Sequence, residues 1–307
     1  MMYNEELKRR YIKEKNEVAT LPSNYLECQF NKLGKFETEL NKDAHDFTVY
    51  EIIEYYKILN VSSLEVIAVL NSQLSQYAQF CLQENLVKDN QNHYLEISLE
   101  QMKLCLNKVL IDRKIVSRDQ VVEWSQQLPN PKDQLIMLGL FEGLKGKDFA
   151  DLVNLRPEDV NGNKLKLIDG REIIVSDMLI KYIEESIAEQ VYYSSSGSQT
   201  KTMPLMDRGY VIKNYPNIKE GTSDFAKGRV IYNSIARSLK YVGVLDFMTA
   251  NSICESGKIW MIKQRSKEIG ISTKDYVYST YIREVEYQFG CKIVKSVFWL
   301  KYEDHLS

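Results

Sequence analysis

Basic and amide side chains recur along one predicted helix in the C-terminal third of the chain. The segment from Ser223 to Val242 has the apolar spacing of a helix. Its turns carry Lys227, Arg229, Asn233, Arg237 and Lys240. Arginine can form two hydrogen bonds with guanine and asparagine two with adenine, and each good pair contributes about 1–3 kcal/mol of discrimination. The chemistry predicted is contact with nucleic acid; the ordinary alternative is the polar face of an amphipathic helix. Gly228 is expected to let the helix backbone approach the bound partner closely.

A second set of basic residues follows this helix. It consists of Lys258, Lys263, Arg265 and Lys267. Their helical spacing predicts either a second cationic surface or an ordinary solvated face.

Cysteine and histidine residues are too scattered to suggest a metal site. The five cysteines are Cys28, Cys81, Cys105, Cys254 and Cys291, and none belongs to a C-x-x-C pair. The three histidines are His45, His93 and His305. This pattern favours reduced thiols in a cytoplasmic protein, with no metal and no cofactor.

Charge is distributed unevenly along the 307 residues, although the net charge is only −2. Residues 196–301 contain 17 Lys or Arg and 9 Asp or Glu, a net charge of +8, so the rest carries −10. A basic segment beside an acidic remainder is typical of a protein with one polyanion-binding face. No apolar run approaches the ~20 residues of a membrane span, and the charged N-terminus does not resemble a secretory signal.

The first part of the chain is predicted to be helical. One helix is expected around Val49–Leu59, and a second after the capping sequence that begins at Ser62-Ser63. Ser98 with Gln101, and Ser117 with Gln120, are the signals of two further helices. Proline restricts the residue before it and cannot continue a helix, so Pro129-Asn130-Pro131 predicts a domain boundary. The expected domains are residues 1–128 and 129–307.

The second part is predicted to be mainly helical with one small sheet. An apolar helix is expected around Leu135–Leu144, and Ser176–Gln190 is a later helix. Between them, residues 164–168 and 171–175 flank Asp169-Gly170, a dipeptide that favours a hairpin turn. The serine-rich segment 194–198 is expected to be a loop. The fold class predicted is mainly α with a small β-sheet.

This arrangement resembles the tyrosine recombinase (phage integrase) family. Residues 46–92 are similar to its helical, SAM-like core-binding domain. Residues 146–160 match, without a gap, the first box of the family, G-L-R-x-x-E-L-x-x-L-x-x-x-D, and the Asp-Gly hairpin follows where the family has its own. Residues 228–256 resemble the long helix, the short link and the second box. The resemblance implies two domains that close around duplex DNA, with the helix from Ser223 in the major groove.

The catalytic set that the resemblance implies is missing from this sequence. In the family two arginines hold the scissile phosphate, a lysine and histidines act on protons, and a tyrosine attacks. The first arginine position falls on Asp148, or on Lys145 if the gap is shifted. The second box, H-x-L-R-H, falls on Asn251 to Glu255, which places Cys254 at the second arginine. A hairpin lysine remains, Lys164 or Lys166, and four tyrosines lie at suitable distances: Tyr276, Tyr278, Tyr281 and Tyr287.

A recombinase scaffold without its chemistry would still bind DNA through phosphate contacts. A chain of this length, lysine- and asparagine-rich composition and replaced boxes is similar to the master repressors of SPβ-type temperate phages. That likeness implies a sequence-specific transcriptional repressor that occupies repeated operator sites in a prophage, maintains lysogeny and is not an enzyme. Double-stranded DNA is the expected partner, and a phage regulatory protein is a second candidate.

Two alternatives remain open on the sequence. One is a divergent, active recombinase that uses Tyr281 or Tyr287. The other is an integrase-like module that regulates a recombinase through protein contacts. The operator, the oligomeric state, the inducing signal, and whether the segment after Lys292 packs in its own chain or on a neighbour are not determined by the sequence.

Overall fold

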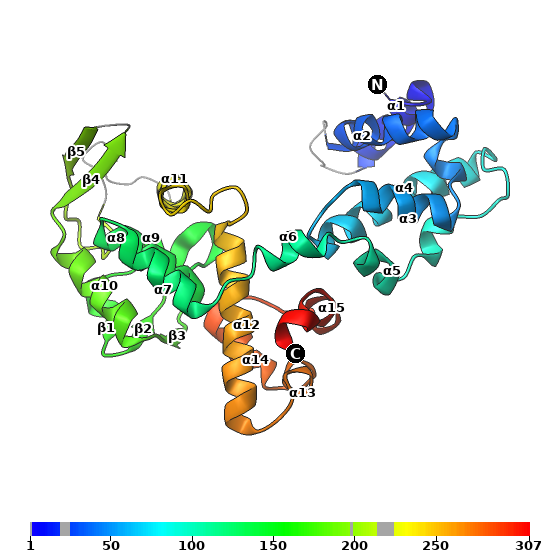
Figure 1. The fold of residues 1–307 in the computed structure, drawn as a ribbon. Helices are drawn as coiled ribbons and strands as arrows, with labels where there is room; N and C mark the ends of the chain where they lie inside the picture. Colours follow the sequence, from blue (N-terminus) through cyan, green and yellow to red (C-terminus); the bar gives the residue numbers. More distant parts are fainter. Residues whose placement is uncertain (1, 19–24, 197–198, 214–223) are drawn as a thin grey trace. The chain divides into compact units, whose positions relative to one another are not determined.

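The computed structural model describes residues 2–18, 25–196, 199–213 and 224–307, and the chain divides into two compact units, residues 1–109 and 110–307 (Figure 1). The predicted boundary after residue 128 needs correction. Helix α7 (Arg118–Gln127) packs against α8 (Pro131–Glu142), so both belong to the second unit. Pro131 interrupts the chain only locally, since it occupies the first turn of α8, where proline is well tolerated.

Unit 1 is helical throughout its described residues. Its elements are α1 (Glu5–Val18), α2 (Tyr25–Leu40), the 3-10 turn η1 (Ala44–Asp46), α3 (Val49–Ile58), α4 (Leu64–Gln83), η2 (His93–Glu96), α5 (Leu99–Leu104) and the start of α6 (Lys108–Asp112). Ser63 caps α4, and the predicted capping box of Ser98 with Gln101 is present on α5. The helix that Ser98 begins ends at Leu104, and α6 follows as a separate short helix.

The core of unit 1 contains a cluster of ionisable side chains beside apolar ones. Lys8 is fully buried, with its Nζ 2.6 Å from Glu37 Oε1 and 3.2 Å from Asp43 Oδ2. Tyr77 donates its hydroxyl proton to Asp43 across 3.1 Å, which connects α4 to the same cluster. A buried cation is tolerated only with such partners, so this network specifies how α1, α2 and α4 pack together.

Unit 2 is built around α8. Its other helices are α7, η3 (Lys147–Phe149), α9 (Ala150–Asn154), η4 (Pro157–Asp159), α10 (Asp177–Ala188), α11 (Asp224–Tyr241), α12 (Ala250–Ile269), α13 (Thr273–Tyr278), α14 (Ile282–Phe289) and α15 (Lys295–Leu306). Helix α8 is buried along most of its length and packs against α7, α10, α11 and α12. The capping box of Ser117 with Gln120 is present at the start of α7, as predicted. Ser223 lies outside the described residues.

Two small antiparallel sheets complete unit 2. The first has the order β1 (Val160–Asn161), β2 (Lys164–Lys166) and β3 (Glu172–Ile174), with Leu165 opposite Ile173. This confirms the predicted Asp-Gly hairpin, and Gly170 adopts φ 84° in its turn.

The second sheet contradicts a prediction. Strands β4 (Val191–Ser196) and β5 (Gln199–Pro204) pair only with each other, where the serine-rich segment was expected to be a loop. Of that segment, residues 197 and 198 lie outside the described part of the chain. Figure 1 shows β4 and β5 extending from the helices of unit 2 as a two-stranded ribbon.

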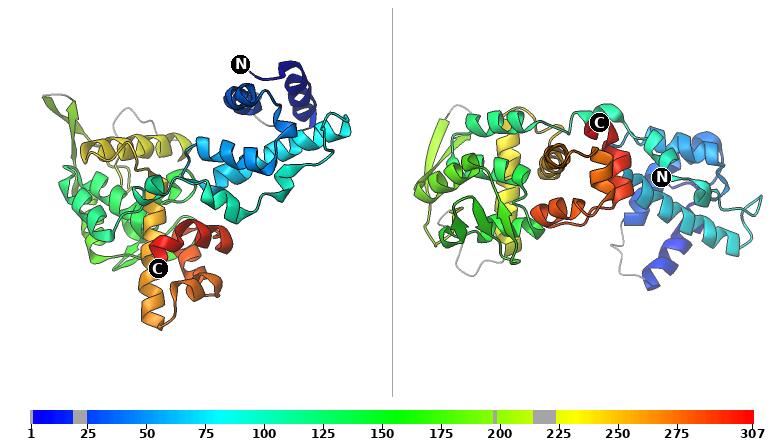
Figure 2. Two further views of the ribbon diagram at one scale, coloured as in Figure 1. Left: turned by 45° about the vertical axis from the view of Figure 1, so that its right-hand side comes forward. Right: turned by 90° about the horizontal axis from the view of Figure 1, so that it is seen from below.

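Helix α12 follows α11 in the chain, and Figure 2 shows it leading from α11 toward α13, α14 and α15. A Cβ on Gly257 of α12 would lie 1.9 Å from the carbonyl oxygen of Phe141, so only glycine allows α12 to approach α8 this closely. The C-terminal helix α15 packs on α13 and α12 of its own chain, and Thr273 Oγ1 donates to Leu306 O across 2.8 Å.

The mainly helical fold predicted from the sequence is confirmed. No helix of the described ranges is both long enough and apolar enough to cross a membrane.

Candidate functional site

Helix α11 exposes one continuous stripe of the predicted residues. The stripe consists of Arg229, Asn233, Arg237 and Lys240. The opposite side of the helix, with Ile231, Ile235 and Leu239, is buried in unit 2. Residues three or four positions apart share a helix face, so the four side chains form one surface. Within the described part of the chain, Arg229, Asn233 and Lys240 make no side-chain hydrogen bond or ion pair, which leaves their polar groups to solvent or to a ligand.

Lys227, at the start of α11, lies apart from this stripe. Its Nζ is 5.0 Å from the ring centre of Tyr210, and the guanidinium of Arg156 is also 5.0 Å from that ring. Such cation–π contacts contribute about 0.5–2 kcal/mol each. Lys227 therefore helps to hold the beginning of α11 on the protein.

Gly228 has a different role from the one predicted. It is buried, and a Cβ at this position would lie 2.1 Å from the carbonyl oxygen of Asp148. The close backbone approach that requires glycine is therefore between α11 and the η3 turn of the same unit. The expected approach to DNA at Gly228 is wrong because this face of the helix is covered by protein.

Arg237 is connected to the second sheet through an aromatic ring. Its guanidinium lies 5.4 Å from the ring centre of Tyr192 on β4, and Lys132 Nζ lies 4.2 Å from the same ring. Tyr192 is 4 % exposed and Lys132 is 3 % exposed, whereas Arg237 is exposed. A buried cation and a surface cation therefore lie near the same ring.

The residues at the altered catalytic positions come together in part. Lys145 Nζ donates to Asn251 Oδ1 across 2.5 Å, which joins the end of α8 to the start of α12. Cys254 is buried one turn further along α12, and burial raises the pKa of its thiol to about 12. Lys258 Nζ pairs with Glu255 Oε1 at 2.8 Å. At neutral pH this centre holds a neutral thiol and cations that already have protein partners.

Asp148 does not join this group. It is exposed and adopts the left-handed conformation with φ 52°, and Phe149 follows with φ 64°. Two consecutive non-glycine residues in this region store backbone strain of order 1–3 kcal/mol each. Of the two alternatives for the first arginine position, Lys145 is the one whose side chain reaches the second box.

The second set of basic residues does not form one patch. Lys258 and Arg265 are paired with carboxylates, Lys258 with Glu255 and Arg265 with Glu268 at 2.6 Å. Lys263 and Lys267 are exposed and about 140° and 180° around α12 from Lys258 by helical geometry. The predicted cluster is therefore divided between two faces of the helix.

The hairpin lysines are available to solvent. Lys164 and Lys166 both project from β2 and are exposed, while Leu165 between them is buried. Lys164 and Lys166 lie on the same face of β2, because successive side chains of a strand point to opposite faces.

The four tyrosines near the C-terminus are held in different surroundings. Tyr276 is buried, and its hydroxyl lies 3.4 Å from Glu284 Oε2; burial and this carboxylate raise its pKa. Tyr287 Oη accepts the backbone N–H of Glu172 across 3.0 Å. Tyr281 stacks on Tyr276 at 6.0 Å between ring centres. The hydroxyl groups of Tyr276 and Tyr287 are thus engaged by other parts of unit 2.

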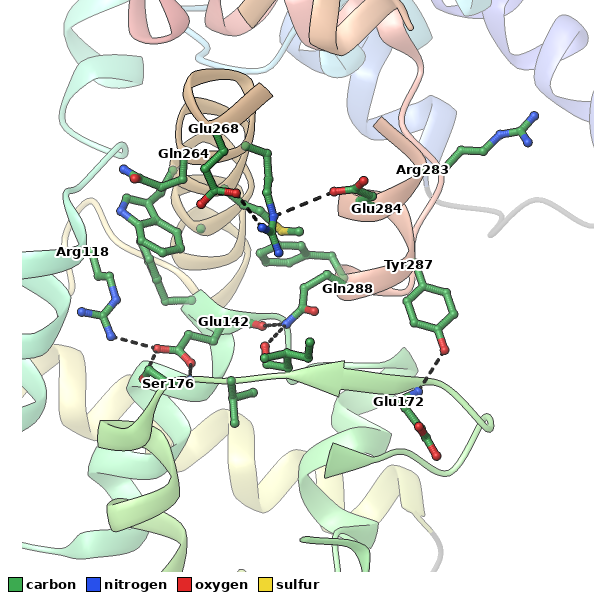
Figure 3. A pocket seen from close by; sticks show the side chains of 18 residues that line it. Arg118, Glu142, Glu172, Ser176, Gln264, Glu268, Arg283, Glu284, Tyr287 and Gln288 are labelled. Atoms are coloured by element: carbon green, nitrogen blue, oxygen red, sulfur yellow. Dashed lines mark hydrogen bonds and ion pairs between the residues drawn. The ribbon is translucent and has the colours of Figure 1, made fainter. Parts of the chain in front are cut away.

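A cavity of about 740 Å³ lies between α8, β3, α12 and α14 (Figure 3). Its wall includes Phe141, Trp260 and Phe289. The dashed lines in Figure 3 mark pairs between some of its charged groups, as in the contact of Arg118 with Glu142 at 3.3 Å, but none is drawn at the guanidinium of Arg283. The sequence pattern contained no signal for this cavity.

Within the described ranges no group of three or more His, Cys, Asp and Glu side chains is placed to hold a metal ion.

Sequence reasoning missed the contacts that fix α11. Tyr192 and Tyr210 each lie near two cations, one contributed by α11 and one by another part of unit 2. The β-branched and aromatic residues Val191 to Tyr193 and the threonines near Lys201 are typical of strands and were a signal for the ribbon. No local pattern could show which cation would face each ring, because Lys132 and Arg237 are far apart in the sequence.

Comparison with protein families gives two matches that cover both units. A model described as the MrpR C-terminal catalytic domain matches residues 115–303, and one described as the MrpR N-terminal core-binding domain matches residues 2–83. The matched ranges lie on either side of the structural division at residue 109, and they agree with the predicted pairing of a core-binding and a recombinase-like domain.

A curated relative and two solved structures are also similar to the chain. The SPbeta prophage-derived uncharacterized protein YopR of Bacillus subtilis (strain 168) is 28% identical over 283 residues, which cover 88% of this chain and 84% of that protein. The Tn1549 transposon integrase (residues 82–397), solved with circular intermediate DNA, has a TM-score of 0.47 at 13% identity, covering 96% of this chain and 94% of the other. XerA recombinase has a TM-score of 0.34 at 11% identity, covering 98% and 99%.

Proposed function

Because the chain belongs to the MrpR family of tyrosine-recombinase-like proteins, we propose that it binds double-stranded DNA at specific sequences and represses transcription there without cutting the DNA. The observation that carries this proposal is the exposed stripe of α11. Arg229, Asn233 and Lys240 present hydrogen-bond donors that the described protein leaves unused. An α-helix of this kind fits the major groove, where such side chains can read base edges.

The altered catalytic centre supports binding without reaction. In the recombinase reaction, two arginine side chains donate hydrogen bonds that stabilise the negative charge developing on the phosphate oxygens. Here Lys145 is bonded to Asn251, and Cys254 is a buried thiol that cannot donate to a phosphate as arginine does. A repressor needs only to occupy its site, so the loss of this grip is compatible with the proposed role.

The relationship to a prophage-derived protein suggests where the sites lie. YopR derives from the SPbeta prophage. We propose that the operators of this chain are short repeated sequences in a prophage, and that their occupation keeps lytic genes silent.

The test is to pass sheared DNA from the source genome over the purified protein at moderate salt and to sequence the retained fragments. The proposal predicts a few discrete fragments that share a short motif upstream of genes. Retention of no DNA, or of all fragments equally, would contradict sequence-specific repression and favour the protein–protein alternative.

A matched pair of variants connects the result to α11. Arg229→Ala removes a predicted base contact, and Lys181→Ala removes an exposed charge of the same sign on α10. If Arg229 contacts a guanine, Arg229→Ala should weaken operator binding by about 5- to 150-fold, the equivalent of 1–3 kcal/mol. Lys181→Ala should leave it within twofold. Equal effects of the two changes would show that charge alone, and not α11, determines binding.

A nicked operator duplex separates repression from recombination. An active recombinase would remain covalently attached to such a substrate through a tyrosine. We expect no complex that survives denaturation, and a covalent complex that disappears in Tyr281→Phe or Tyr287→Phe would establish the recombinase alternative.

A further inference from the structure

A hollow of about 370 Å³ lies where the β4–β5 ribbon meets α11. Ser194 of β4 and Arg237 and Lys240 of α11 line it, together with Asn130 and Asp133 from α8 and the turn before it. It therefore combines two cations and a hydroxyl group from elements that are distant in the sequence. None of these residues belongs to the altered catalytic positions.

The acidic group in this hollow is already satisfied by the protein. Asp133 Oδ1 accepts the hydroxyl proton of Ser234, and Asp133 Oδ2 accepts an N–H of Asn130 across 3.1 Å. From Val191 to Met206 the ribbon contains no Asp or Glu. Arg237 and Lys240 thus face a surface whose one carboxylate has its charge partly offset by hydrogen bonds, and a bound anion would gain from both cations.

The ribbon is fixed at its base and not merely attached by its ends. Asn130 forms two hydrogen bonds with the backbone of Tyr193, accepting its N–H across 2.7 Å and donating to its carbonyl across 3.0 Å. Leu205 N–H donates to Gln190 O across 2.8 Å, which closes the base from the other strand. These bonds give the ribbon a defined direction relative to α8 and α11.

Strand register places basic and hydroxyl groups on the side of the ribbon that meets α11. Side chains alternate between the two faces of a strand, so Ser194 shares a face with Tyr192. Lys201 is the pairing partner of Ser194, and it is exposed. The face that contacts Arg237 through Tyr192 therefore continues outward with a serine and a lysine.

We propose that this junction of ribbon and α11 is a binding site for a backbone phosphate of DNA, held by Arg237, Lys240 and Ser194, with Tyr192 as the residue that positions Arg237. The inference rests on the proposed function, because it assumes that α11 enters a DNA groove. It goes further in two ways: Arg237 is assigned to a phosphate of the DNA backbone and not to a base, and the ribbon becomes part of the DNA-binding surface.

Geometry favours a phosphate over a base at this point. An α-helix largely fills a major groove of about 12 Å width, so an element that stands beside the helix meets the backbone that borders the groove. The ribbon is such an element, and Arg237 is the member of the helix stripe that lies beside it, 5.4 Å from the ring centre of Tyr192. Its guanidinium donates one N–H to Ser234 Oγ across 3.4 Å, which leaves its other N–H groups for the oxygens of a phosphate.

The salt dependence of binding tests this assignment. Each phosphate contact contributes about 0.9 to the slope of log K against log salt concentration. For operator duplex recovered from the genomic selection, Arg237→Ala and Lys240→Ala should each reduce the slope, and the double variant should reduce it by about one. The same reduction should occur with a duplex of unrelated sequence, because a phosphate contact does not depend on the bases. Lys181→Ala, at an exposed lysine of α10, is the control and should leave both slopes unchanged.

Tyr192 is tested by pairing it with Arg237. Tyr192→Phe keeps the ring and should bind DNA as the wild type does, whereas Tyr192→Leu should lower affinity and slope in the same direction as Arg237→Ala. In the Arg237→Ala background, Tyr192→Leu should add no further loss, since residues that act through one another are not additive. Thermal unfolding of each variant shows whether the fold is intact.

Several results would overturn the inference. Loss of affinity for the operator alone, with unchanged slope, would assign Arg237 to a base. A further loss from Tyr192→Leu in the Arg237→Ala background would show that Tyr192 acts by supporting the fold. The phosphate site is ruled out, and the proposed function stands, if three variants bind DNA with wild-type affinity and salt slope: Arg237→Ala, Lys240→Ala and Tyr192→Leu. If the wild-type protein itself binds no DNA, the proposed function fails first.

Discussion

Two regions of unit 2 differ in whether their basic side chains are paired within the protein. At the altered catalytic centre, Lys145 is bonded to Asn251 and Lys258 is paired with Glu255, beside the buried Cys254. Along α11, Arg229 and Lys240 have no such partners within the described residues. Pairing inside the protein engages donors that a phosphate could otherwise take, whereas an exposed cation without partners retains all of them.

This difference fits the proposed function, in which the scaffold keeps DNA binding and loses the recombination reaction. Catalysis by a recombinase depends on a few donors placed around one phosphate, so we expect Cys254 at the second arginine position to abolish it. Binding is the sum of many contacts that do not depend on one another, so we expect it to survive the same change. The contrast predicts that substitutions in the centre alter stability, and that substitutions on the α11 stripe alter DNA affinity.

The strongest challenge to this contrast is Cys254→Arg, which restores the residue type of the second catalytic arginine. Cys254 is 5 % exposed, so the new cation would be buried without a prepared partner. We expect the free energy of unfolding to fall by about 3–5 kcal/mol, with no DNA cleavage gained. Chemical denaturation measures the loss, and Cys28→Arg, at an exposed cysteine, is the control with little effect. Retained stability together with cleavage would show that the centre is only one residue from activity.

Gly228→Ala should affect both stability and DNA binding, because Gly228 sets how closely α11 packs on the η3 turn. The added methyl group would lie 2.1 Å from Asp148 O, so α11 must shift away from the η3 turn. We expect a loss of about 1–3 kcal/mol in unfolding free energy, accompanied by weaker DNA binding. Asn233→Ala, an exposed change on the same helix, should weaken binding at unchanged thermal stability. Normal DNA binding in a destabilised Gly228→Ala protein would show that the position of α11 does not matter.

The buried thiol of Cys254 predicts a pH dependence of stability. Its pKa is raised to about 12 in the folded protein, above about 8.5 in an unfolded chain. The neutral thiol therefore contributes stability that is fully present below pH 8.5 and is lost as the pH rises toward 12. Between pH 8 and pH 10 the wild type should lose about 1–2 kcal/mol more than Cys254→Ala in denaturant unfolding. Parallel losses would show that the thiol ionises freely.

The smallest effect is expected at Asp148, the other sequence candidate for the first arginine. Its φ of 52° is strained for any residue except glycine. Asp148→Gly should raise the free energy of unfolding by about 0.5–1 kcal/mol, whereas Asp148→Ala should lower it. Since Asp148 is exposed and outside the Lys145–Asn251 pair, DNA affinity should not change by more than about twofold. A large fall in affinity for either variant would place this turn in the interface.

Much of the helical fold was predictable because its signals are local. Ser98 with Gln101, and Ser117 with Gln120, start helices where the sequence predicted them, since a cap involves residues only three positions apart. The Asp-Gly hairpin is confirmed for the same reason. The domain boundary was misplaced because Pro129-Asn130-Pro131 reports a local break, whereas the packing of α7 on α8 is a tertiary contact.

The candidate site was predictable only on its exposed side. Helical spacing was enough to place Arg229, Asn233, Arg237 and Lys240 on one stripe. It was not enough to predict the role of Gly228. A side chain at this position would collide with the carbonyl oxygen of Asp148, a residue far away in the sequence. The ribbon was missed because its serines favour loops as strongly as edge strands, and pairing between β4 and β5 decided the outcome.

The sequence by itself therefore determined the helices, the hairpin, the position of the basic stripe and the absence of the recombinase arginines from the two boxes. The tertiary structure decided which cations are paired and which remain exposed, that Lys145 and not Asp148 meets the second box, and that Tyr192 lies between Lys132 and Arg237. The physical reason is range: caps, turns and helix faces depend on neighbours in the chain, whereas charge pairing and ring contacts depend on residues that only folding brings together.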